Sequence, residues 1–230
     1  MGSEMAMKVI ARIRNDFSGK FGIPRQSGVV PELKGKIVFE PEYGNADALR
    51  GIEGFDYLWL IWQFSEAVRE QWSPTVRPPI LGGNTRVGVF ATRSPFRPNA
   101  LGLSSVRLEK AELHTPEGPV LHIAGADLMN GTPILDIKPY LAYADSHPDA
   151  AQGFRGDGWQ RSLQVDFPAE LLAKIPQAQQ AGLLGILKND PRPAYHHDPE
   201  RVYVLPFGRR EISFRVQDRR LVVLGAEEVQ

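Results

Sequence analysis

The stretch Tyr57-Leu-Trp-Leu-Ile-Trp62, closed by Gln63, is the longest strongly apolar run in this chain of 230 residues. It is far shorter than the roughly 20 residues that a helix needs to cross a bilayer, so no membrane span and no membrane partner are expected. Because both faces of the run are apolar, it predicts a strand over Tyr57–Phe64 that is covered on both sides.

Further strands are predicted on either side of this run, separated by loops rich in Pro and Gly. β-branched and apolar residues in Val87–Thr92 and Val106–Ala111 favour sheet over helix. The complete set of predicted strands is Lys8–Arg14, Lys36–Glu40, Tyr57–Phe64, Arg86–Thr92, Leu103–Leu113, Val120–Ala126 and Ile134–Ile137, with one short helical window that begins at Ala46–Leu49. Many strands with so little helix predict a mainly β domain over residues 1–150, either a barrel or a sandwich.

The composition changes after Tyr143. Residues 144–159 are rich in Asp, Gly, Pro and His, which is typical of a linker. The elements predicted beyond it are a strand at Ser162–Phe167, a helix over Pro168–Lys188 that breaks or kinks at Pro176, and a hairpin of Glu211–Val216 and Arg220–Leu224 around Gln217-Asp218-Arg219. They predict a small α+β domain over residues 160–230.

Composition excludes several kinds of chemistry. The chain has no Cys, which rules out disulfide frameworks, thiolate zinc sites, iron–sulfur clusters and Cys nucleophiles. Lys+Arg and Asp+Glu both total 27, so a nucleic-acid partner needs a local basic patch rather than the field of the whole protein. The first seven residues lack a basic end followed by an apolar stretch, so we expect no signal peptide and a cytoplasmic location.

The usual motifs of nucleotide, phosphate and acyl-transfer sites are missing. The sequence contains no G-x-G-x-x-G after a strand, no G-x-x-x-x-G-K-[ST] and no G-x-S-x-G. His196-His197-Asp198 is the nearest approach to a metal motif, but adjacent histidines in a strand or loop point apart. We therefore interpret it as a solvated loop and expect no metal.

Three segments concentrate polar residues in stiff loops: Phe21–Gly28, Val89–Gly102 and Ala126–Tyr140. Taken singly, each has an ordinary interpretation, because Arg25 fits a surface residue, the arginines of the second loop fit ion pairs, and Asn130-Gly131 fits a tight turn between two strands. Together they offer planar donors, an amide and exposed backbone groups, which favours a pocket for an adenosine-like ligand.

These same segments resemble the TsaA-like (TrmO) family of tRNA N6-threonylcarbamoyladenosine methyltransferases. The similarity runs through the N-terminal region and returns weakly in the second domain. Its segments are Phe21–Gly28, Ala46–Gly51, Arg77-Pro-Pro79 with Leu81-Gly-Gly-Asn84, Gly88–Gly102, Gly131–Leu141 and Asp190–Tyr195.

The resemblance implies a β-barrel methyltransferase that binds S-adenosylmethionine outside the Rossmann class and works as a homodimer. It also implies the substrate: a tRNA whose adenosine 3′ of the anticodon already carries threonylcarbamoyl and is methylated at N6. Carried across by motif, the residues expected to contact S-adenosylmethionine are Pro24, Arg25, Gln26, Ser65, Glu66, Arg93, Leu103, Met129, Asn130, Gly131 and Thr132.

Two positions depart from the family pattern. Relatives commonly carry His where this chain has Ser65, and Asp where it has Asn130. Because an Asn side chain cannot act as a carboxylate base, we expect Asn130 to serve through hydrogen bonding and turn geometry.

Candidate roles follow from the chemistry of methyl transfer to an amide-like nitrogen, where positioning supplies much of the acceleration. We expect Arg93 or Arg97 to stabilise developing oxyanion character on the carbamoyl group or to grip the threonine carboxylate. Asp136 and Tyr140 are further candidates, as proton acceptors. Lys138 and Arg192 are candidates for holding phosphate or the threonine carboxylate, although a purely structural Asp136–Lys138 pair fits the alternation of a strand equally well.

RNA recognition predicts aromatic stacking and phosphate contacts. The stacking candidates are Phe96, Tyr140 and Tyr195, and the basic edge of the second domain comprises Arg209, Arg210, Arg219 and Arg220. The alternative for that edge is a solvated hairpin with ion pairs to Glu200, Glu211 or Asp218. Two alternatives for the whole protein also stay open: a methyltransferase that acts on another acceptor, and a barrel that binds nucleotide or RNA without catalysis.

Overall fold

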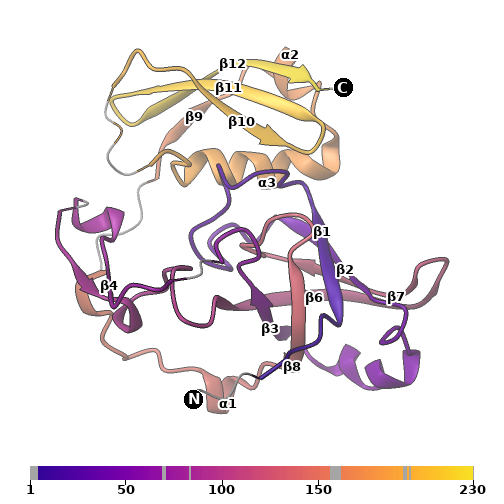
Figure 1. Cartoon of the computed structure of the whole chain (residues 1–230). Helices are drawn as coiled ribbons and strands as arrows, with labels where there is room; N and C mark the ends of the chain where they lie inside the picture. Colours follow the sequence, from indigo (N-terminus) through magenta and orange to yellow (C-terminus); the bar gives the residue numbers. More distant parts are fainter. Residues whose placement is uncertain are drawn as a thin grey trace.

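The computed structural model describes residues 5–68, 71–82, 84–155, 162–193, 196 and 198–229. Within these residues the chain is mainly β, with an N-terminal barrel and a smaller C-terminal unit of one sheet and two α-helices (Figure 1). This arrangement confirms the predicted fold class.

The barrel strands are β1 (Ala11–Asn15), β2 (Lys34–Phe39), β3 (Tyr57–Gln63), β6 (Leu101–Thr115), β7 (Gly118–Ala124) and β8 (Pro133–Pro139). They close in the order β1-β2-β7-β6-β3-β8, and neighbouring strands are antiparallel. The apolar run that predicted a strand is β3. Leu58, Leu60 and Trp62 point into the barrel core, whereas Trp59 and Ile61 are half-buried on the outer face.

The predicted strand Arg86–Thr92 is wrong for most of its length. β5 is only Val87–Gly88, and it pairs with β4 (Thr75–Val76) in a small arm outside the barrel. The chain then turns through the 3₁₀-helix η4 (Val89–Ala91), because the Val89 N–H bonds the Pro74 carbonyl and the Val89 carbonyl accepts the Thr92 N–H. Phe90 is left 72% exposed on this turn.

Short helical turns connect the strands: η1 (Ala46–Leu49), η2 (Ile52–Gly54), η3 (Pro79–Leu81), α1 (Ala142–Asp145) and η5 (Gly153–Arg155). The predicted helical window is η1, a 3₁₀ turn whose first N–H groups are capped by the Asn45 side chain, which accepts from the Asp47 N–H. The predicted linker follows α1, and part of it lies outside the described residues.

The C-terminal unit contains β9 (Gln164–Asp166), α2 (Ala169–Leu172), α3 (Gln177–Lys188), β10 (Tyr203–Phe207), β11 (Arg210–Gln217) and β12 (Arg220–Glu228), with strand order β10-β11-β12-β9. The break at Pro176 and the hairpin at Asp218-Arg219 confirm two predictions; both turn residues have positive φ. β10 was not predicted, because Pro206 interrupts its pattern. An edge strand, however, tolerates proline.

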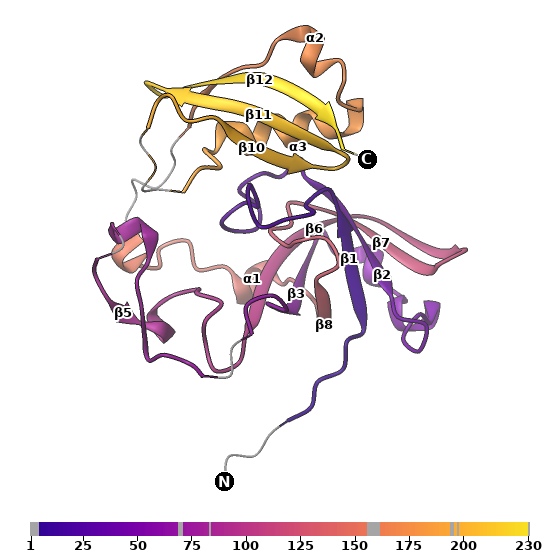
Figure 2. The ribbon, with the colours of Figure 1, turned by 45° about the horizontal axis from the view of Figure 1, so that its top comes forward.

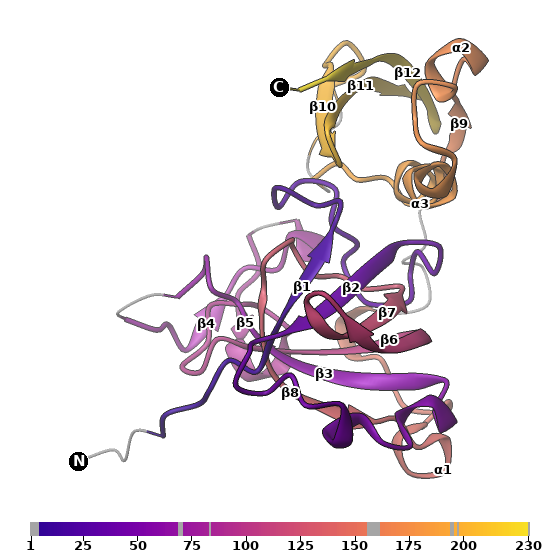
Figure 3. The same ribbon diagram turned by 90° about the vertical axis from the view of Figure 1, so that its right-hand side faces the viewer.

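The connection between β1 and β2 packs against this C-terminal unit, and Figures 1 and 3 show it running up to α3. Phe17, Val30 and Leu33 share a buried core with residues of α3 and of the second sheet. Asp16 adds two hydrogen bonds across the junction, since its carbonyl accepts from the Gly208 N–H (2.8 Å) and its carboxylate from the Gln179 amide (2.7 Å). The division into residues 1–150 and 160–230 stays a prediction, and this connection contributes to both cores.

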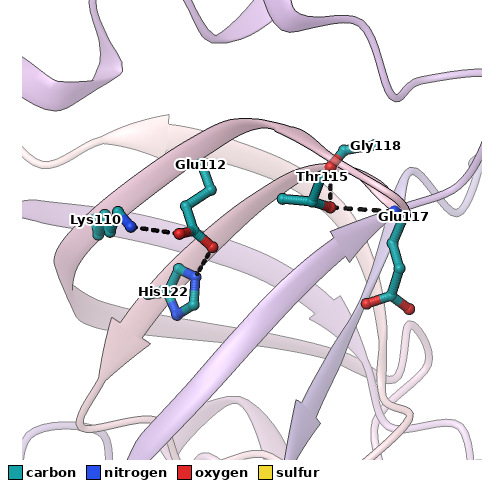
Figure 4. Close-up of polar contacts among 6 residues, drawn as sticks. All are labelled: Lys110, Glu112, Thr115, Glu117, Gly118 and His122. Atoms are coloured by element: carbon teal, nitrogen blue, oxygen red, sulfur yellow. Dashed lines mark hydrogen bonds and ion pairs between the residues drawn. The ribbon is translucent and has the colours of Figure 1, made fainter.

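The β6–β7 hairpin projects away from the rest of the molecule (Figures 1 and 2). Figure 4 shows that the Thr115 hydroxyl bonds the Gly118 carbonyl (2.6 Å) and accepts from the Glu117 N–H (3.1 Å), which closes the turn. Nearby, the Glu112 carboxylate accepts from Lys110 and His122, and these bonds lower its pKa to about 2. The turn of the hairpin is thus closed by local hydrogen bonds, while the strands that lead to it belong to the barrel.

Candidate active site

A cavity of about 1130 Å³ lies over the outward-facing residues of β3 and β6, at the end where Gln63 pairs with Leu101. Its walls come from four loops, at residues 20–27, 64–68, 90–99 and 127–132. These loops are far apart in sequence, but the barrel brings their ends together because β3, β6 and β8 are neighbours.

Most of the residues predicted for the cofactor, and both candidate catalytic arginines, line this one cavity: Pro24, Arg25, Gln26, Ser65, Glu66, Arg93, Arg97, Leu103, Met129 and Thr132. The predictions therefore converge on one place in the fold. Their individual roles stay predictions.

Asn130 and Gly131 form the predicted turn beside the cavity rather than part of its lining. Gly131 has a φ of 81°, and the Asn130 side-chain oxygen accepts from the Asn15 N–H (3.1 Å) at the end of β1. The strands on either side of this turn, β7 and β8, are not neighbours in the barrel, so the turn is not a hairpin. The bond to Asn15 is consistent with the structural role expected for an Asn at this position.

One hydrogen bond joins two opposite walls of the cavity: the Arg93 guanidinium donates to the Gln26 side-chain oxygen. The Gln26 amide nitrogen bonds the Arg25 carbonyl, which orients the amide plane. The Arg25 guanidinium in turn donates to the backbone carbonyl of Arg192 (3.1 Å), in the second unit. The planar groups expected to contact an adenosine-like ligand are thus held by bonds to one another and to the backbone.

Arg97 stabilises its own loop. Its guanidinium donates to the carbonyls of Thr92 (3.0 Å) and Ser94 (3.4 Å), in place of the acidic partners considered from sequence. The Thr92 hydroxyl donates to the Val89 carbonyl (2.8 Å) and accepts from the Ser94 N–H (3.2 Å). Two prolines stiffen the same segment, so this wall of the cavity is held by local bonds.

Asp127 also lines the cavity, and sequence reasoning did not select it. Its carboxylate accepts from the Ser104 hydroxyl (2.5 Å), whose oxygen accepts from the Trp62 indole N–H (2.9 Å). Burial raises the pKa of Asp127, and hydrogen bonds from Ser104 and the Ser27 backbone lower it in part. In the sequence, Asp127 could have been selected because it is an acidic residue directly after the predicted strand Val120–Ala126 and inside the third polar segment.

The other candidate proton acceptors do not line the cavity. Asp136 forms an ion pair with Lys138 (3.1 Å) on β8, which is the structural pairing that the strand alternation had offered. Lys138 lies opposite Trp59 on the neighbouring strand β3. The Tyr140 ring packs on Trp59, with 5.5 Å between ring centroids. Trp59 itself lines the cavity, so these residues lie just behind its wall.

Arg192 is committed to a buried partner. It makes two hydrogen bonds to the Asp190 carboxylate, at 2.8 and 2.9 Å, and the two side chains are only 12% and 8% exposed. Such a two-point pair fixes the guanidinium in position. The Arg192 backbone carbonyl also accepts from Arg25, and a role for Arg192 in holding phosphate or the threonine carboxylate stays a prediction.

The remaining basic residues lie on the second sheet. Arg220 pairs with Asp166 (2.6 Å) and Arg219 bonds the Ser162 carbonyl (3.4 Å), so the hairpin is tied to β9 rather than to the acids considered from sequence. Arg209 is exposed at the β10–β11 turn, and Arg210 is half-buried beside it. Of the stacking candidates, Phe96 lines the cavity, and Tyr195 lies outside the described residues.

In the part of the chain that the structure describes, no three His, Asp or Glu side chains gather as a metal ion requires. The described helices are also all too short or too polar to cross a bilayer.

Comparison with known proteins identifies the family. The model of the tRNA-methyltransferase O N-terminal domain matches residues 12–146, and the TrmO C-terminal domain model matches residues 160–229. The chain belongs to the TrmO family. A relative from Escherichia coli K12, named tRNA (adenine(37)-N6)-methyltransferase, is 39% identical over 98% of this chain and 99% of its own length.

Other members of the TrmO family agree in sequence and in fold. A Pseudomonas aeruginosa protein named as a putative S-adenosylmethionine-dependent methyltransferase is 39% identical over 84% of this chain and 85% of its own length. A crystal structure of TrmO from Pseudomonas aeruginosa superposes with a TM-score of 0.78 at 29% identity, over 98% of this chain and all of that one. The likeness therefore covers both parts of the fold.

Proposed function

We propose that this protein is an S-adenosylmethionine-dependent methyltransferase that methylates N6 of adenosine 37 in tRNA, with the threonylcarbamoylated base as its acceptor. We further propose that it acts as a homodimer in the cytoplasm. The observation that carries the proposal is the Arg93–Gln26 bond inside a cavity of about 1130 Å³, in a chain whose relatives are named as methyltransferases of this kind.

The residues that line the cavity fit the cofactor. Gln26 presents an amide, Arg93 a planar cation, and Leu103 an apolar surface that is 57% exposed. Amides, planar donors and apolar side chains in one concave site are the groups that recognise a nucleoside. S-adenosylmethionine supplies a methyl group on a positively charged sulfur, and the lining would hold it beside the acceptor base.

The chemistry of the proposed acceptor accounts for arginines in the cavity lining. N6 of threonylcarbamoyladenosine is amide-like, and its nucleophilicity rises as negative charge develops on the carbamoyl oxygen. A guanidinium aimed at that oxygen, or at the threonine carboxylate, stabilises the charge and positions the base. Arg93 fits this role better than Arg97, because Arg93 bonds a side chain of the cavity lining, Gln26, whereas Arg97 bonds the Thr92 and Ser94 carbonyls of its own loop.

The proposal of a homodimer is supported by apolar surface next to the cavity. Phe90 and Leu103 line the cavity and are 72% and 57% exposed, and Trp72, which is 51% exposed, packs against Phe90. Exposed aromatic and aliphatic residues gathered at one place are typical of a protein interface. Light scattering measures the mass in solution, and a mass of one chain at micromolar concentration would contradict this part of the proposal.

The central experiment follows methyl transfer from labelled S-adenosylmethionine to two tRNA preparations, one with and one without threonylcarbamoyl at position 37. We expect label only in the modified tRNA. Equal labelling of both would contradict the proposed acceptor, and binding of the cofactor without any transfer would favour the non-catalytic barrel.

A pair of arginine variants tests the site in the same assay. Arg93→Ala should lose methyl transfer while it keeps cooperative unfolding, because Arg93 lies in a loop and its guanidinium bonds the Gln26 side chain rather than the barrel core. Arg86→Ala is the matched control: Arg86 is exposed, lies seven residues earlier and does not line the cavity. Loss of cooperative unfolding in Arg93→Ala alone would show that Arg93 is a structural residue.

A further inference from the structure

The methyl transfer proposed above needs a group that accepts the proton on N6. As the bond between N6 and the methyl carbon forms, the bond from that carbon to sulfur breaks and its electron pair stays on sulfur. The N6 proton must then leave, because the product nitrogen carries a carbon in its place. A side chain that removes the proton in the transition state typically accelerates such a step by about 10²–10⁴-fold.

Two carboxylates line the cavity among the described residues, Glu66 and Asp127. Glu66 is paired with Lys20 at 3.3 Å, and its side chain is 55% exposed. A solvated carboxylate in a surface ion pair is not held in a fixed direction toward an acceptor. Asp127 differs in both respects, since it is partly buried and is held by hydrogen bonds.

The bonds that hold Asp127 come from the interior of the barrel. Trp62 and Ser104 are buried, and the indole, the hydroxyl and the carboxylate form a chain that ends in the cavity. The backbone N–H of Ser27 gives a second bond from the loop that carries Gln26. The carboxylate is therefore positioned by rigid elements on two sides of the site, as a catalytic group requires.

We propose that Asp127 is the general base that takes the N6 proton of the acceptor adenosine. This inference rests on the proposed function and deepens it. Burial raises the pKa of Asp127 above its ordinary value, which makes its carboxylate a better proton acceptor than an exposed one. Arg93, whose charge acts on Asp127, lies on the same cavity, so the base and the proposed oxyanion contact face one acceptor.

The test compares Asp127→Asn with Asp149→Asn, which makes the same change at an exposed carboxylate that does not line the cavity. Three quantities are measured: single-turnover methyl transfer to threonylcarbamoylated tRNA, S-adenosylmethionine affinity by calorimetry, and the dependence of the transfer rate on pH. We expect Asp127→Asn to slow transfer by about 10²–10⁴-fold with its affinity for the cofactor unchanged. Asp149→Asn should keep a rate near that of the wild type.

A second variant keeps the carboxylate in place. Ser104→Ala removes a hydrogen bond that lowers the pKa of Asp127, so the acid limb of its pH–rate profile should move to higher pH. A purely structural Asp127 predicts a lower rate with an unmoved profile.

Different failures point to different errors. If the wild type transfers methyl but Asp127→Asn is equally fast, or loses cofactor affinity in proportion to rate, Asp127 is not the base and the proposed function stands. If the wild type transfers no methyl to any tRNA, the proposed function fails and the base assignment fails with it.

Discussion

Two loops face each other across the cavity, and they are stabilised by different parts of the molecule. The loop at residues 21–28 brings Arg25 and Gln26, and the loop at residues 92–99 brings Arg93 and Arg97. The second is held by bonds within itself. The first is held by a core that lies mostly in the C-terminal unit.

The anchor of the 21–28 loop is aromatic. The Phe21 ring lies nearly parallel to the rings of Tyr203 and Phe214, with centroids 6.4 and 6.5 Å away. Gly22 follows with a φ of 88° against the side chain of Leu205. Because these contacts come from β10 and β11, the wall that carries Gln26 depends on the folding of the second unit, whereas the wall that carries Arg93 does not.

The largest effect is expected where this anchor is tightest. A Cβ at Gly22 would lie 2.1 Å from Leu205 Cδ1, and Leu205 is fully buried, so its side chain would have to repack within the core. Gly22→Ala therefore combines left-handed strain with overpacking, and should lower the free energy of unfolding by about 2–4 kcal/mol. Strain passed to the loop should weaken S-adenosylmethionine binding by about tenfold, which corresponds to about 1.4 kcal/mol.

The control for Gly22→Ala is Gly51→Ala. Gly51 has a φ of 87°, but a Cβ there would have no atom within 4 Å, so only the left-handed strain of about 1–2 kcal/mol remains. Urea unfolding followed by circular dichroism measures both. Equal losses in the two variants would show that the contact with Leu205 does not hold the loop.

The same contrast explains what the sequence predicts. In the 92–99 loop the prolines and short hydroxyl side chains stand next to the arginines they hold, so its stiffness is visible in the chain itself. The anchors of the 21–28 loop lie about 180 residues further on, and no local pattern predicts that Phe21 stacks on Tyr203. Apolar runs and β-branched residues predicted a mainly β domain, and the family resemblance predicted the barrel. Strand β10 was missed because Pro206 interrupts its pattern.

The candidate site also depends on contacts that the sequence does not predict. Most of the residues that motif resemblance predicted for the cofactor line the cavity. The resemblance gave no sign that Asp127 hydrogen-bonds Ser104, or that Arg192 is bound to Asp190, since both depend on burial and direction in space. Asp136 and Lys138 share a strand face as expected, and that face lies behind the cavity wall.

A smaller effect is expected in the self-supported loop. Thr92→Val removes a hydroxyl that makes two turn bonds, and should cost about 0.5–1.5 kcal/mol of stability. Thr115→Val is matched to it, because the Thr115 hydroxyl makes the same two kinds of bond in the β6–β7 hairpin (Figure 4).

Stability and cofactor affinity distinguish the two threonines. Both variants should lose similar stability, but only Thr92→Val should weaken S-adenosylmethionine binding in calorimetry, since only Thr92 lines the cavity. If Thr115→Val also weakens cofactor binding, the 92–99 loop is not stabilised independently of the rest of the barrel.

The smallest effect concerns Asp16, which joins the β1–β2 connection to α3 through Gln179. Burial raises the pKa of Asp16 above its ordinary value of 3.8, so the folded state binds the proton more tightly than the unfolded state. The stability that this group contributes is therefore full at low pH and is lost as pH rises through the folded-state pKa. Asp16→Asn should gain stability relative to the wild type over that window and keep the difference above it.

Asp145 supplies the opposite sign as a control. Hydrogen bonds from the Leu141 N–H and the Trp59 indole lower its pKa, so its contribution is present above the ordinary value and is lost as pH falls. Urea midpoints measured from pH 3 to 7 should separate from the wild type upward for Asp16→Asn and downward for Asp145→Asn as pH rises. A response of the same sign in both variants would contradict the opposite effects of burial at Asp16 and of hydrogen bonds at Asp145.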